Sequence, residues 1–488
     1  MANREKKRIH FVSLGCPKNR VDSEVMLGVA ARSGYDHVDA PEDADVIVVN
    51  TCGFIDAAKQ ESIDTILSFS ELKKSGSLER LVVAGCLSQR YSGDLEKELP
   101  EVDHFLGSSD MLKLERVLEG RAERLLVGNP ADWVPSASDP RVVSTRGASA
   151  YLKLAEGCNR KCSFCVIPQI RGKQRSRTPD DVVEEARRLA DAGVLELNLV
   201  SQDTVAYGRD LSDAPSLASV VRRIADVPGL RWVRIFYLYP EKLDEALLDL
   251  LANHPRVVPY VDMPLQHAAD AMLRRMRRGH GGKRQRDVVS RLREKVPNLT
   301  MRTAFIVGHP GETDEEFQEL CDFVEWAEFD RVGVFHYSDE ETCHAHTFEG
   351  KVPRKVALQR AKQLMKLQRG ISKRKNRALV GRSVEVLVEG PSEESELVLV
   401  GRHAGQAPEI DGQVFLSGGE ARPGEMVNVT IRKATDYDLL GELSEDEAAD
   451  ATRVAARGAK KRGTKPAEPP SLVHRASDGR RVTLRTVS

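Results

Sequence analysis

The sequence predicts a three-part protein of the α/β class: an N-terminal parallel α/β domain, a central partial (βα)6 barrel and a small C-terminal antiparallel β-barrel. Three observations predict this order. Short apolar runs alternate with helical patterns, a segment rich in Pro, Ser, Gly and Asp divides them, and five short apolar runs with glycine-rich turns come last. The expected divisions are a domain at 8–127, a linker at 128–146, a barrel at 147–377, a β-barrel at 378–441 and a disordered basic tail at 442–488.

The N-terminal part contains three apolar runs, RIHFVSLGC, ADVIVVNTC and RLVVAGC, with helical patterns between them. Strands separated by helices of this length indicate a parallel sheet with right-handed crossovers. Each run ends on a cysteine, namely Cys16, Cys52 and Cys86. Because all strands of a parallel sheet end at the same edge, the three cysteines can converge on one metal site. Three separate buried thiols are the alternative, which the repeated position at strand ends disfavours.

The central part contains six apolar strand candidates: YLKLAEGC, LELNLVSQD, RWVRIFYLYP, VVPYVDMPLQH, TMRTAFIVGHPG and RVGVFHYS. Helical patterns separate them, and one of these begins with Thr178 as the expected N-cap and Pro179 at the first helical position. Six βα units make a barrel short of the usual eight. An incomplete barrel has an open side, which suits a large substrate.

The C-terminal part begins after a helical pattern at 354–377 that carries ten Lys or Arg and no acid. That pattern fits either a solvated helix face or a contact with an RNA-containing partner. The runs SVEVLVEG, ELVLVGRHAG, QVFLSGG, EMVNVTIRKA and DYDLLGEL then predict five short strands of a small barrel.

Composition excludes some classes of protein. The net charge is −1 with 30% charged residues, so no overall basic excess indicates a general nucleic-acid binder. The N-terminus lacks the apolar stretch of a signal peptide, and no window approaches the ~18 apolar residues of a spanning helix. We therefore expect a cytoplasmic protein with no membrane partner. In that compartment the eight cysteines are expected to be metal ligands or reactive thiols rather than disulfides.

The decapeptide EGCNRKCSFC holds Cys158, Cys162 and Cys165 with the spacing C-x3-C-x2-C. A four-iron, four-sulfide cluster is commonly held by four thiolates, so three leave one iron open to a small molecule. S-adenosylmethionine (SAM) suits that iron, because its amino and carboxylate groups can chelate it. One electron can then split the sulfonium C–S bond and give a 5′-deoxyadenosyl radical. A zinc site would more often show paired C-x2-C motifs.

With Phe164 directly before its last cysteine, this motif resembles that of the radical SAM enzymes. The three-part layout over residues 8 to about 441 is similar to that of the methylthiotransferases, and the terminal barrel resembles their TRAM module. The stretches LGCPKNRVDSE, AEGCNRKCSFCVIPQIRGKQRSR, VDMPLQHA and TAFIVGHPGETDEEF resemble the ribosomal-protein branch of that family, RimO. The tRNA branch, MiaB, typically reads GCQMN where this chain has GCPKN.

The resemblance implies a transferase that inserts a methylthio group at the β-carbon of one aspartate in a small-subunit ribosomal protein. It implies two [4Fe-4S] clusters, each with an open iron, held by the two sets of three cysteines. SAM would serve twice, as methyl donor and as radical source, and an external one-electron reductant would be needed. No side-chain acid or base is expected to be catalytic, because an unactivated C–H bond is too weak an acid for one.

Further cofactor contacts are expected in the loops at the carboxyl end of the barrel strands, where barrel sites lie. In related barrels the loop after the second strand often binds the amino group of the methionine moiety. Each candidate has loop capping or a turn as its alternative role. The candidates are Phe164, Ser201, Gln202, Asp203, Gln266, His267, Gly308, Gly311 and Glu312.

Charge gives a separate test of the substrate. Residues 382–440 carry eleven acidic and five basic side chains, a net charge of −6. An acidic barrel favours a basic ribosomal protein over tRNA, whose phosphates need a basic surface. The basic segment at 354–377 could touch ribosomal RNA if the assembled subunit is the substrate. A tRNA adenosine methylthiotransferase and an iron–sulfur redox protein without transferase activity remain the alternatives.

Two other cysteines fall outside the motifs. The sequence CHAH, with Cys343, His344 and His346, stands where relatives usually carry a Gly/Thr/Pro loop, and we expect exposed loop residues rather than a metal site. Cys321 lies in a helical pattern between Leu320 and Phe323 and is expected in the core.

Overall fold

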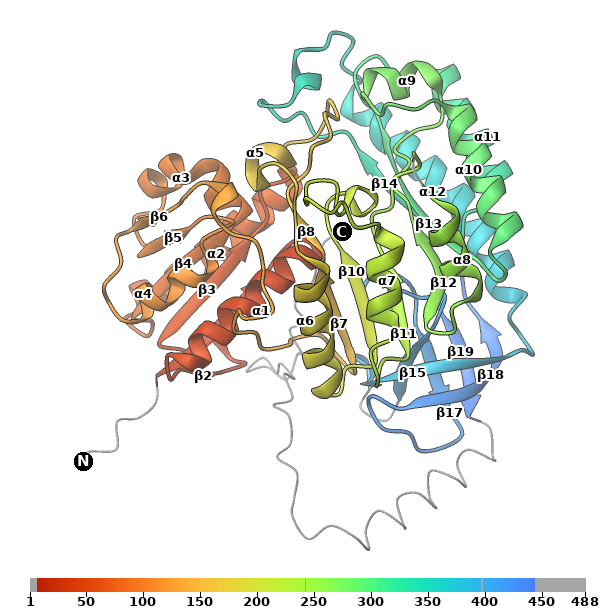
Figure 1. Cartoon of the computed structure of the whole chain (residues 1–488). Coiled ribbons are helices and arrows are strands. Elements are labelled where there is room, and N and C mark those ends of the chain that lie inside the picture. The colour runs from red at the N-terminus through yellow and green to blue at the C-terminus, as the bar shows by residue number, and fades with distance from the viewer. Residues whose placement is uncertain (1–6, 242, 396–397, 444–488) are drawn as a thin grey trace, which may run out of the picture.

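The computed structural model describes residues 7–241, 243–395 and 398–443. Figure 1 shows three parts in the predicted order: an N-terminal sheet with helices, a central barrel, and a small β-barrel below it. The expected fold class is confirmed. The predicted basic tail at 442–488 lies, from residue 444 on, outside the described residues.

The N-terminal part is a six-stranded parallel sheet with the order β2-β1-β3-β4-β5-β6. Its strands alternate their side chains between two apolar layers, one under α1 and α4 and the other under α2 and α3. The strands are β1 (Arg8–Ser13), β2 (Asp36–His37), β3 (Val46–Thr51), β4 (Arg80–Gly85), β5 (His104–Leu106) and β6 (Leu125–Leu126). The helices are α1 (Pro17–Arg32), α2 (Asp56–Lys74), α3 (Cys86–Glu98) and α4 (Leu114–Leu118).

The central part is an open barrel of six parallel strands with the order β14-β13-β12-β11-β10-β7. These strands are β7 (Ser149–Lys153), β10 (Glu196–Val200), β11 (Trp232–Ile235), β12 (Val257–Asp262), β13 (Thr300–Val307) and β14 (Arg331–His336). No strand of the described chain joins β7 to β14, so the barrel stays open between them. Six units were predicted because each apolar run is bounded by its own helical pattern.

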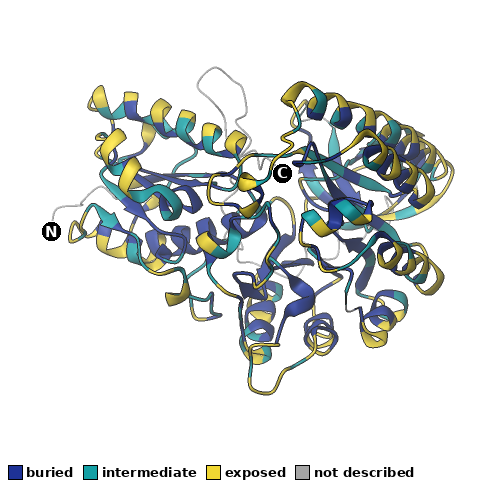
Figure 2. Cartoon of the chain, turned by 90° about the horizontal axis from the view of Figure 1, so that it is seen from above, coloured by how far each residue is buried: buried dark blue, intermediate teal, exposed yellow. Residues whose placement is uncertain are grey.

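Helices cover the outer face of the barrel, as the yellow outer surfaces and dark blue inner surfaces of Figure 2 show. They are α6 (Pro179–Asp191), α7 (Leu217–Ala225), α8 (Glu245–Asn253), α10 (Gly282–Lys295), α11 (Asp314–Ala327) and α12 (Arg354–Arg377), whereas the short helices α5 (Ile167–Arg171) and α9 (Asp270–Arg275) lie in loops, α5 at the junction with the N-terminal domain. The expected N-cap is confirmed, because the Thr178 side chain accepts a hydrogen bond from Asp181 N–H. A short antiparallel pair, β8 (Ala155–Glu156) and β9 (Arg175–Ser176), flanks the cysteine loop.

The C-terminal part is a closed five-stranded barrel, which confirms the five predicted strands. It is not wholly antiparallel as expected, because the strand at Val414–Ser417 pairs in parallel with the strand at Leu439–Leu443. The strands are β15 (Ser383–Pro391), β16 (Leu399–His403), β17 (Val414–Ser417), β18 (Met426–Ala434) and β19 (Leu439–Leu443).

The three parts share one buried apolar cluster that includes Val21 of α1, Phe236 and Tyr260 of the open barrel, and Leu387 of β15. Arg20 of α1 also pairs with Glu409 of the β-barrel at 2.9 Å. The predicted linker is packed rather than free: its Arg141 donates to Glu24 and Glu185 on opposite sides. The two cysteine sets are therefore held in a fixed relation.

The helices of the described residues include none long and apolar enough to span a membrane.

Candidate metal and cofactor site

The first set of cysteines lies at neighbouring strand ends of the N-terminal sheet. Cys16 is the N-cap of α1 and follows β1, Cys52 follows β3, and Cys86 follows β4 as the first residue of α3. Strands β1, β3 and β4 are adjacent, so the three thiols come to one edge as predicted. The amino ends of α1 and α3 favour negative charge, which suits thiolates at Cys16 and Cys86.

Glycine lets these loops approach one another closely. Gly15 has φ +94°, and a Cβ at this position would lie 2.8 Å from Cys52 Cβ and 3.2 Å from Cys52 Sγ. Gly53 is similarly confined, because its Cβ would lie 2.8 Å from the Cys86 carbonyl oxygen. A side chain at either position would push two cysteine loops apart.

Two buried polar residues that the sequence analysis did not single out complete this site. Asn19 Nδ2 donates to the carbonyl oxygens of Leu14 and Thr51, both at 2.9 Å. Arg171, from α5 of the open barrel, donates to Asn19 Oδ1 at 2.5 Å and to Cys86 Sγ at 3.3 Å. The first cysteine set therefore depends on a residue from the second domain.

Arg171 belongs to a buried ionic network between the two domains. It pairs with Asp22 of α1 at 2.8 Å and with Glu156 at 3.3 Å. Lys153 at the end of β7 pairs with the same two carboxylates. Because these charges balance one another, the network joins the domains without leaving an unpaired ion inside.

The second set of cysteines lies in the loop after β8. Cys158 is buried, whereas Cys162 and Cys165 are partly exposed. Arg278 Nη1 donates to Cys162 Sγ at 3.3 Å, and the backbone N–H of Arg160 donates to Cys158 Sγ at 3.4 Å. Each cysteine set thus has one arginine side chain that donates to a sulfur.

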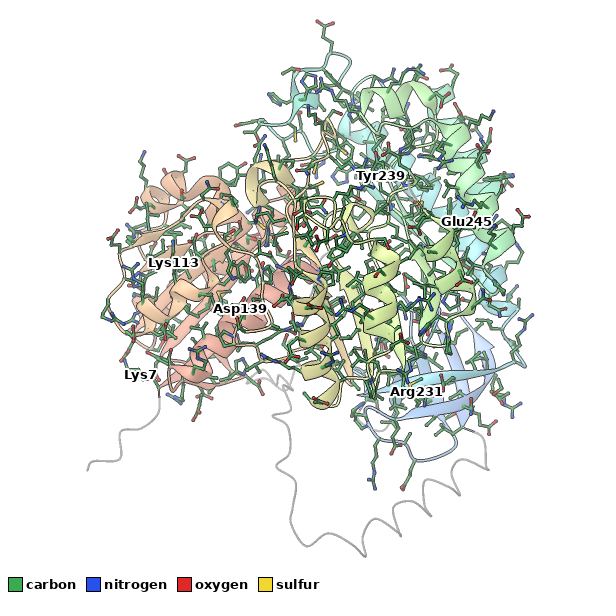
Figure 3. All side chains as sticks on the ribbon, viewed as in Figure 1. Lys7, Lys113, Asp139, Arg231, Tyr239 and Glu245 are labelled. Atoms are coloured by element: carbon green, nitrogen blue, oxygen red, sulfur yellow. The ribbon has the colours of Figure 1, made fainter. Side chains whose placement is uncertain are left out.

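The ring of Tyr239 holds the two arginines of the second set in place. Its centroid lies 3.6 Å from the guanidinium carbon of Arg160 and 4.3 Å from that of Arg278, in the upper part of the barrel in Figure 3. The Tyr239 hydroxyl donates to the Arg278 carbonyl oxygen. Cation–π contacts of this kind position a guanidinium without neutralising its charge.

The two sets lie side by side. Val166, the residue after Cys165, packs in one buried cluster with Cys86, Ile170 and Cys343. Helix α5 starts at Ile167 and ends at Arg171, so it runs from the second set to the first.

Burial disfavours free thiolates in both sets. Desolvation and the charge of neighbouring cysteines raise the pKa of Cys52 and Cys165 far above the usual thiol value. Desolvation also raises the pKa of Cys158 to about 11. A bound metal centre deprotonates its cysteine ligands, so thiolates become stable here only with a positive partner.

In the part of the chain that the structure describes, no three His, Cys, Asp or Glu side chains are placed to hold a single metal ion. The thiolates of a four-iron cluster bind different iron atoms, so they need not converge on one point. Whether each cysteine set fits such a cluster therefore depends on the number and kind of its ligands. Each set offers three thiols and an arginine side chain that donates to one of the sulfurs. The first set also has closely packed loops that contain glycine. These features fit two clusters with three protein ligands each.

The loop after β10 offers acceptors for a cationic group. Asp203 is 4% exposed; its Oδ2 accepts from Arg160 Nε at 2.6 Å, while its Oδ1 has no hydrogen-bond partner among the described residues. Gln202 Oε1 is likewise buried with no partner in that part of the chain. These two atoms suit the amino group of a methionine moiety. Ser201 differs, because its hydroxyl bonds to Thr204 at 3.0 Å.

The candidates after β12 and β13 bond mainly to one another. His267 Nε2 lies 3.1 Å from Glu312 Oε1, and Glu312 also accepts from the Gly308 N–H and from Arg360. These contacts tie the two loops to α12. Gly308 has φ +75°, and a Cβ there would lie 2.4 Å from Ala357 Cβ. These contacts match the alternative role of loop capping. A cofactor role for these residues stays a prediction.

The remaining candidates line the same end of the barrel. Gln266 has φ +73° and joins strand β13 through an isolated bridge to Phe305. Gly311, with φ +80°, lies against Arg275. Phe164 packs on a buried cluster of Ala269, Met272 and Met276 and thereby anchors the cysteine loop.

The expectation for CHAH is wrong for Cys343. This residue is 4% exposed and packs against Cys86, whereas His344 and His346 are exposed as expected. The loop is drawn inward because Glu340 pairs with Arg90 and Ala345 N–H donates to the Ser163 carbonyl oxygen. Cys321 lies in the core, as predicted.

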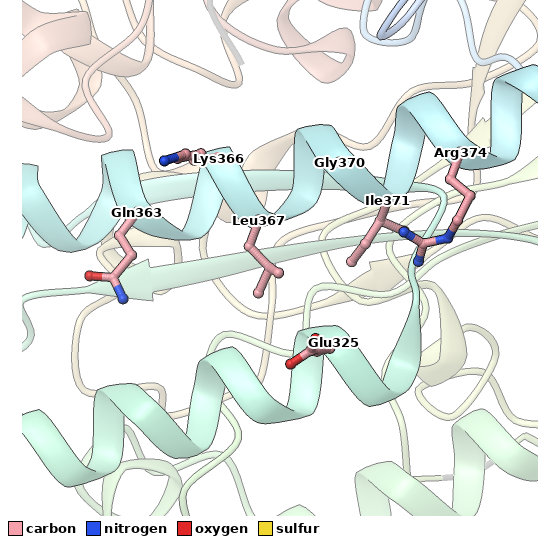
Figure 4. A pocket seen from close by; sticks show the side chains of 7 residues that line it. All are labelled: Glu325, Gln363, Lys366, Leu367, Gly370, Ile371 and Arg374. Carbon is pink, nitrogen blue, oxygen red and sulfur yellow. The ribbon is translucent and has the colours of Figure 1, made fainter.

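A separate cavity of about 400 Å³ lies between α11 and α12. Glu325 of α11 faces Gln363, Lys366 and Leu367 of α12 across it, as Figure 4 shows. It is lined by these two helices alone, so it is not part of the cysteine site.

Family matches cover the chain in the same order as its three parts. Residues 8–107 match the uncharacterized protein family UPF0004, residues 152–324 the Radical SAM superfamily, and residues 380–443 the TRAM domain.

Two relatives are similar over most of their length. The ribosomal protein uS12 methylthiotransferase RimO of Sorangium cellulosum (strain So ce56) is 68% identical over 447 residues, 90% of this chain and 92% of that protein. The protein of the same name from Myxococcus xanthus (strain DK1622) is 49% identical over 439 residues, again 90% and 92%.

One solved structure has a similar fold. The radical S-adenosylmethionine methyltransferase TsrM from Kitasatospora setae, with cobalamin and a [4Fe-4S] cluster bound, has a TM-score of 0.51. The match covers 68% of this chain and 72% of that one at 15% identity, so the likeness concerns the fold alone.

Proposed function

Because this chain belongs to the RimO family of ribosomal protein uS12 methylthiotransferases, we propose that it inserts a methylthio group at the β-carbon of an aspartate in uS12. The observation that carries the proposal is the adjacency of two three-cysteine sets, joined by α5 and Arg171. The three family matches support a division into an N-terminal domain at 8–127, a radical SAM barrel at 147–377 and a TRAM-like barrel at 378–441.

Cys158, Cys162 and Cys165 would hold one [4Fe-4S] cluster, and the set of Cys16, Cys52 and Cys86 the other. When bound, the clusters and SAM would supply one-electron cleavage of a sulfonium bond, and the open iron of the first set's cluster would carry or donate the sulfur. The chain contributes binding and orientation. Each cleavage of SAM consumes one electron, which an external reductant has to supply.

The residues after β10 would orient SAM. Asp203 and Gln202 present buried acceptors without partners, and Arg160 fixes the Asp203 carboxylate through its Oδ2. Phe164, Gln266 and Gly311 would shape the rest of the site. Ser201, His267, Gly308 and Glu312 would support it through the hydrogen bonds and backbone positions described above.

The positive charge of helix α12 favours the assembled small subunit as the substrate. Half of its basic residues pair with acids of neighbouring elements, for example Arg374 with Glu328 and Lys375 with Asp330. Arg354, Lys355, Lys362, Lys366 and Arg377 are exposed and have no ion pair within the described chain. Such charges suit ribosomal RNA around uS12. A cytoplasmic location follows from a ribosomal substrate.

Methylthiolation assays test the proposed function directly. The anaerobically reconstituted protein, with SAM and dithionite, is expected to add one methylthio group to free uS12 or to isolated small subunits, as read by mass spectrometry. Faster reaction on the subunit would support the role of α12. Modification of tRNA adenosine with uS12 unchanged would contradict the proposal and favour the tRNA branch.

Replacing either arginine donor with methionine is expected to change one cluster selectively. Arg278→Met removes a positive donor from Cys162, and Arg171→Met removes one from Cys86. Loss of positive charge disfavours the reduced state, so the midpoint potential of the adjacent cluster should fall. We expect about a tenfold change in the oxidised-to-reduced ratio, about 59 mV for one electron.

Redox titration followed by electron paramagnetic resonance measures this change. Each variant serves as the control for the other, because each should shift the cluster whose sulfur it contacts more than the neighbouring cluster. Equal shifts of both clusters in both variants would show that the arginines act only through general destabilisation.

A further inference from the structure

Lys18 carries a buried positive charge where the N-terminal sheet meets the open barrel. It lies two residues after Cys16, in the first turn of α1, and is 8% exposed. Its Nζ lies 3.4 Å from the centroid of the Tyr237 ring. Tyr237 follows β11 at the carboxyl end of the barrel, the face at which barrel enzymes bind their substrates.

This ammonium has no ion-pair partner among the residues that the structure describes. The carboxylate at the end of β12, Asp262, is already engaged: its Oδ1 binds Arg302 Nη1 at 2.8 Å, and its Oδ2 accepts the Tyr237 N–H at 3.1 Å. The other buried lysine nearby, Lys153, differs sharply, because two carboxylates neutralise it. Of these two buried lysines, Lys18 is the one without a carboxylate at ion-pair distance among the described residues.

A buried ammonium without a counter-ion is costly, and proteins normally pair such a charge. The Tyr237 ring offsets part of that cost through a cation–π contact, but an aromatic face does not cancel the charge. Tyr237 itself holds a left-handed backbone, with φ +56°, which is rare for an aromatic residue. A costly cation on a strained aromatic support indicates a binding position for an anion.

We propose that Lys18 binds the carboxylate of the substrate aspartate and so orients the β-carbon that receives the methylthio group. This inference rests on the proposed function and adds a specificity-determining residue to it. The β-carbon is bonded directly to the carboxylate carbon, so fixing the carboxylate restricts where the reacting C–H bond points. The position beside Cys16 brings that carbon to the side of the first cysteine set.

Two other anions could meet Lys18, and the experiment must separate them from the substrate. SAM also carries a carboxylate, and a cluster on Cys16 would itself be negatively charged. A substrate role predicts that Lys18 distinguishes aspartate from asparagine in uS12. Neither of the other roles predicts such discrimination.

The test is a double-mutant cycle on the reconstituted full-length protein with SAM present. Binding of uS12, and of uS12 with asparagine at the modified position, is measured anaerobically for wild type, Lys18→Met and Lys113→Met. Lys113, labelled in Figure 3, is a partly exposed lysine of the same domain that pairs with Asp110 and has 42% side-chain exposure. Methionine keeps approximately the length of lysine and removes its charge.

Wild type and Lys113→Met are expected to bind the aspartate form about 10- to 100-fold more tightly than the asparagine form. Lys18→Met is expected to bind both forms alike, with iron content and SAM affinity unchanged. Retained preference for aspartate in Lys18→Met would overturn the inference. Weaker SAM binding or lost iron with that preference intact would assign Lys18 to SAM or to the cluster. If wild type does not modify uS12 at all, the proposed function fails instead.

Discussion

Replacing Cys52 with serine is expected to halve the iron of the anaerobically reconstituted protein, from about eight to about four atoms per chain. Cys52 is one of three thiols at the first site, and a serine hydroxyl is a far weaker ligand for iron than a thiolate. Methylthio product should disappear. Cleavage of SAM to 5′-deoxyadenosine should persist, because the second cysteine set is intact. Iron and sulfide analysis with product detection measures both effects.

Two variants sharpen this prediction. Cys162→Ser should also lose about half of the iron, but it should abolish SAM cleavage as well. Cys321→Ser is the matched control, because Cys321 is buried in α11 away from both sets and should leave the iron unchanged. Full iron content in Cys52→Ser would rule out the assignment of the first site.

The cysteine sets could be predicted from sequence because their positions follow from local pattern. Cys16, Cys52 and Cys86 each end an apolar run, and parallel pairing brings such ends together whatever the rest of the chain does. The motif at Cys158 carries its own spacing. These features need no knowledge of distant contacts, so periodicity and spacing were sufficient.

Residues that act across the domain junction could not be found in this way. Arg171 reaches Asn19 over 152 positions of sequence, and neither residue stands out in its own segment. Lys18 belongs to the GCPKN motif, but the sequence does not show that Tyr237 lies against it. Cys343 is expected at the surface because its segment stands where relatives carry a Gly/Thr/Pro loop, whereas ion pairs with the N-terminal domain draw that loop inward.

Short edge strands were missed for a different reason. The edge strands β2 and β6 have two residues each, and β5 beside β6 has three, too few to show alternation. Strands β2 and β5 pair with the longer strands β1 and β4, and β6 then pairs with β5.

Replacing Glu196 with glutamine is expected to detach the TRAM-like barrel from the radical SAM barrel. Glu196 is fully buried in β10 and accepts from Arg402 of β16 at 2.6 Å and from Arg234 of β11 at 2.9 Å. Removing its charge leaves Arg234 without a carboxylate partner and leaves Arg402 with Glu389 alone. Breaking a buried ion pair in this way costs about 3–5 kcal/mol. Urea unfolding and hydrogen exchange of β15 and β16 measure the loss.

The same barrel provides the control. Glu442 pairs with Arg432 on the surface, where the side chains are 46% and 57% exposed. Solvent screens that pair, so Glu442→Gln should cost at most about 1 kcal/mol. Equal effects of the two variants would mean that the Glu196 cluster does not hold the barrels together.

The dependence on pH gives an independent check with a defined sign. Burial opposes ionisation of Glu196, but the charges of Arg402 and Arg234 outweigh it and lower its pKa to about 2. A carboxylate with a depressed pKa contributes stability above its unfolded value of about 4.3, and that contribution is lost as the pH falls toward about 2. The stability difference between wild type and Glu196→Gln should therefore be constant near neutral pH and shrink progressively below about pH 4. A difference that stays constant down to pH 2 would show that Glu196 acts through shape rather than charge.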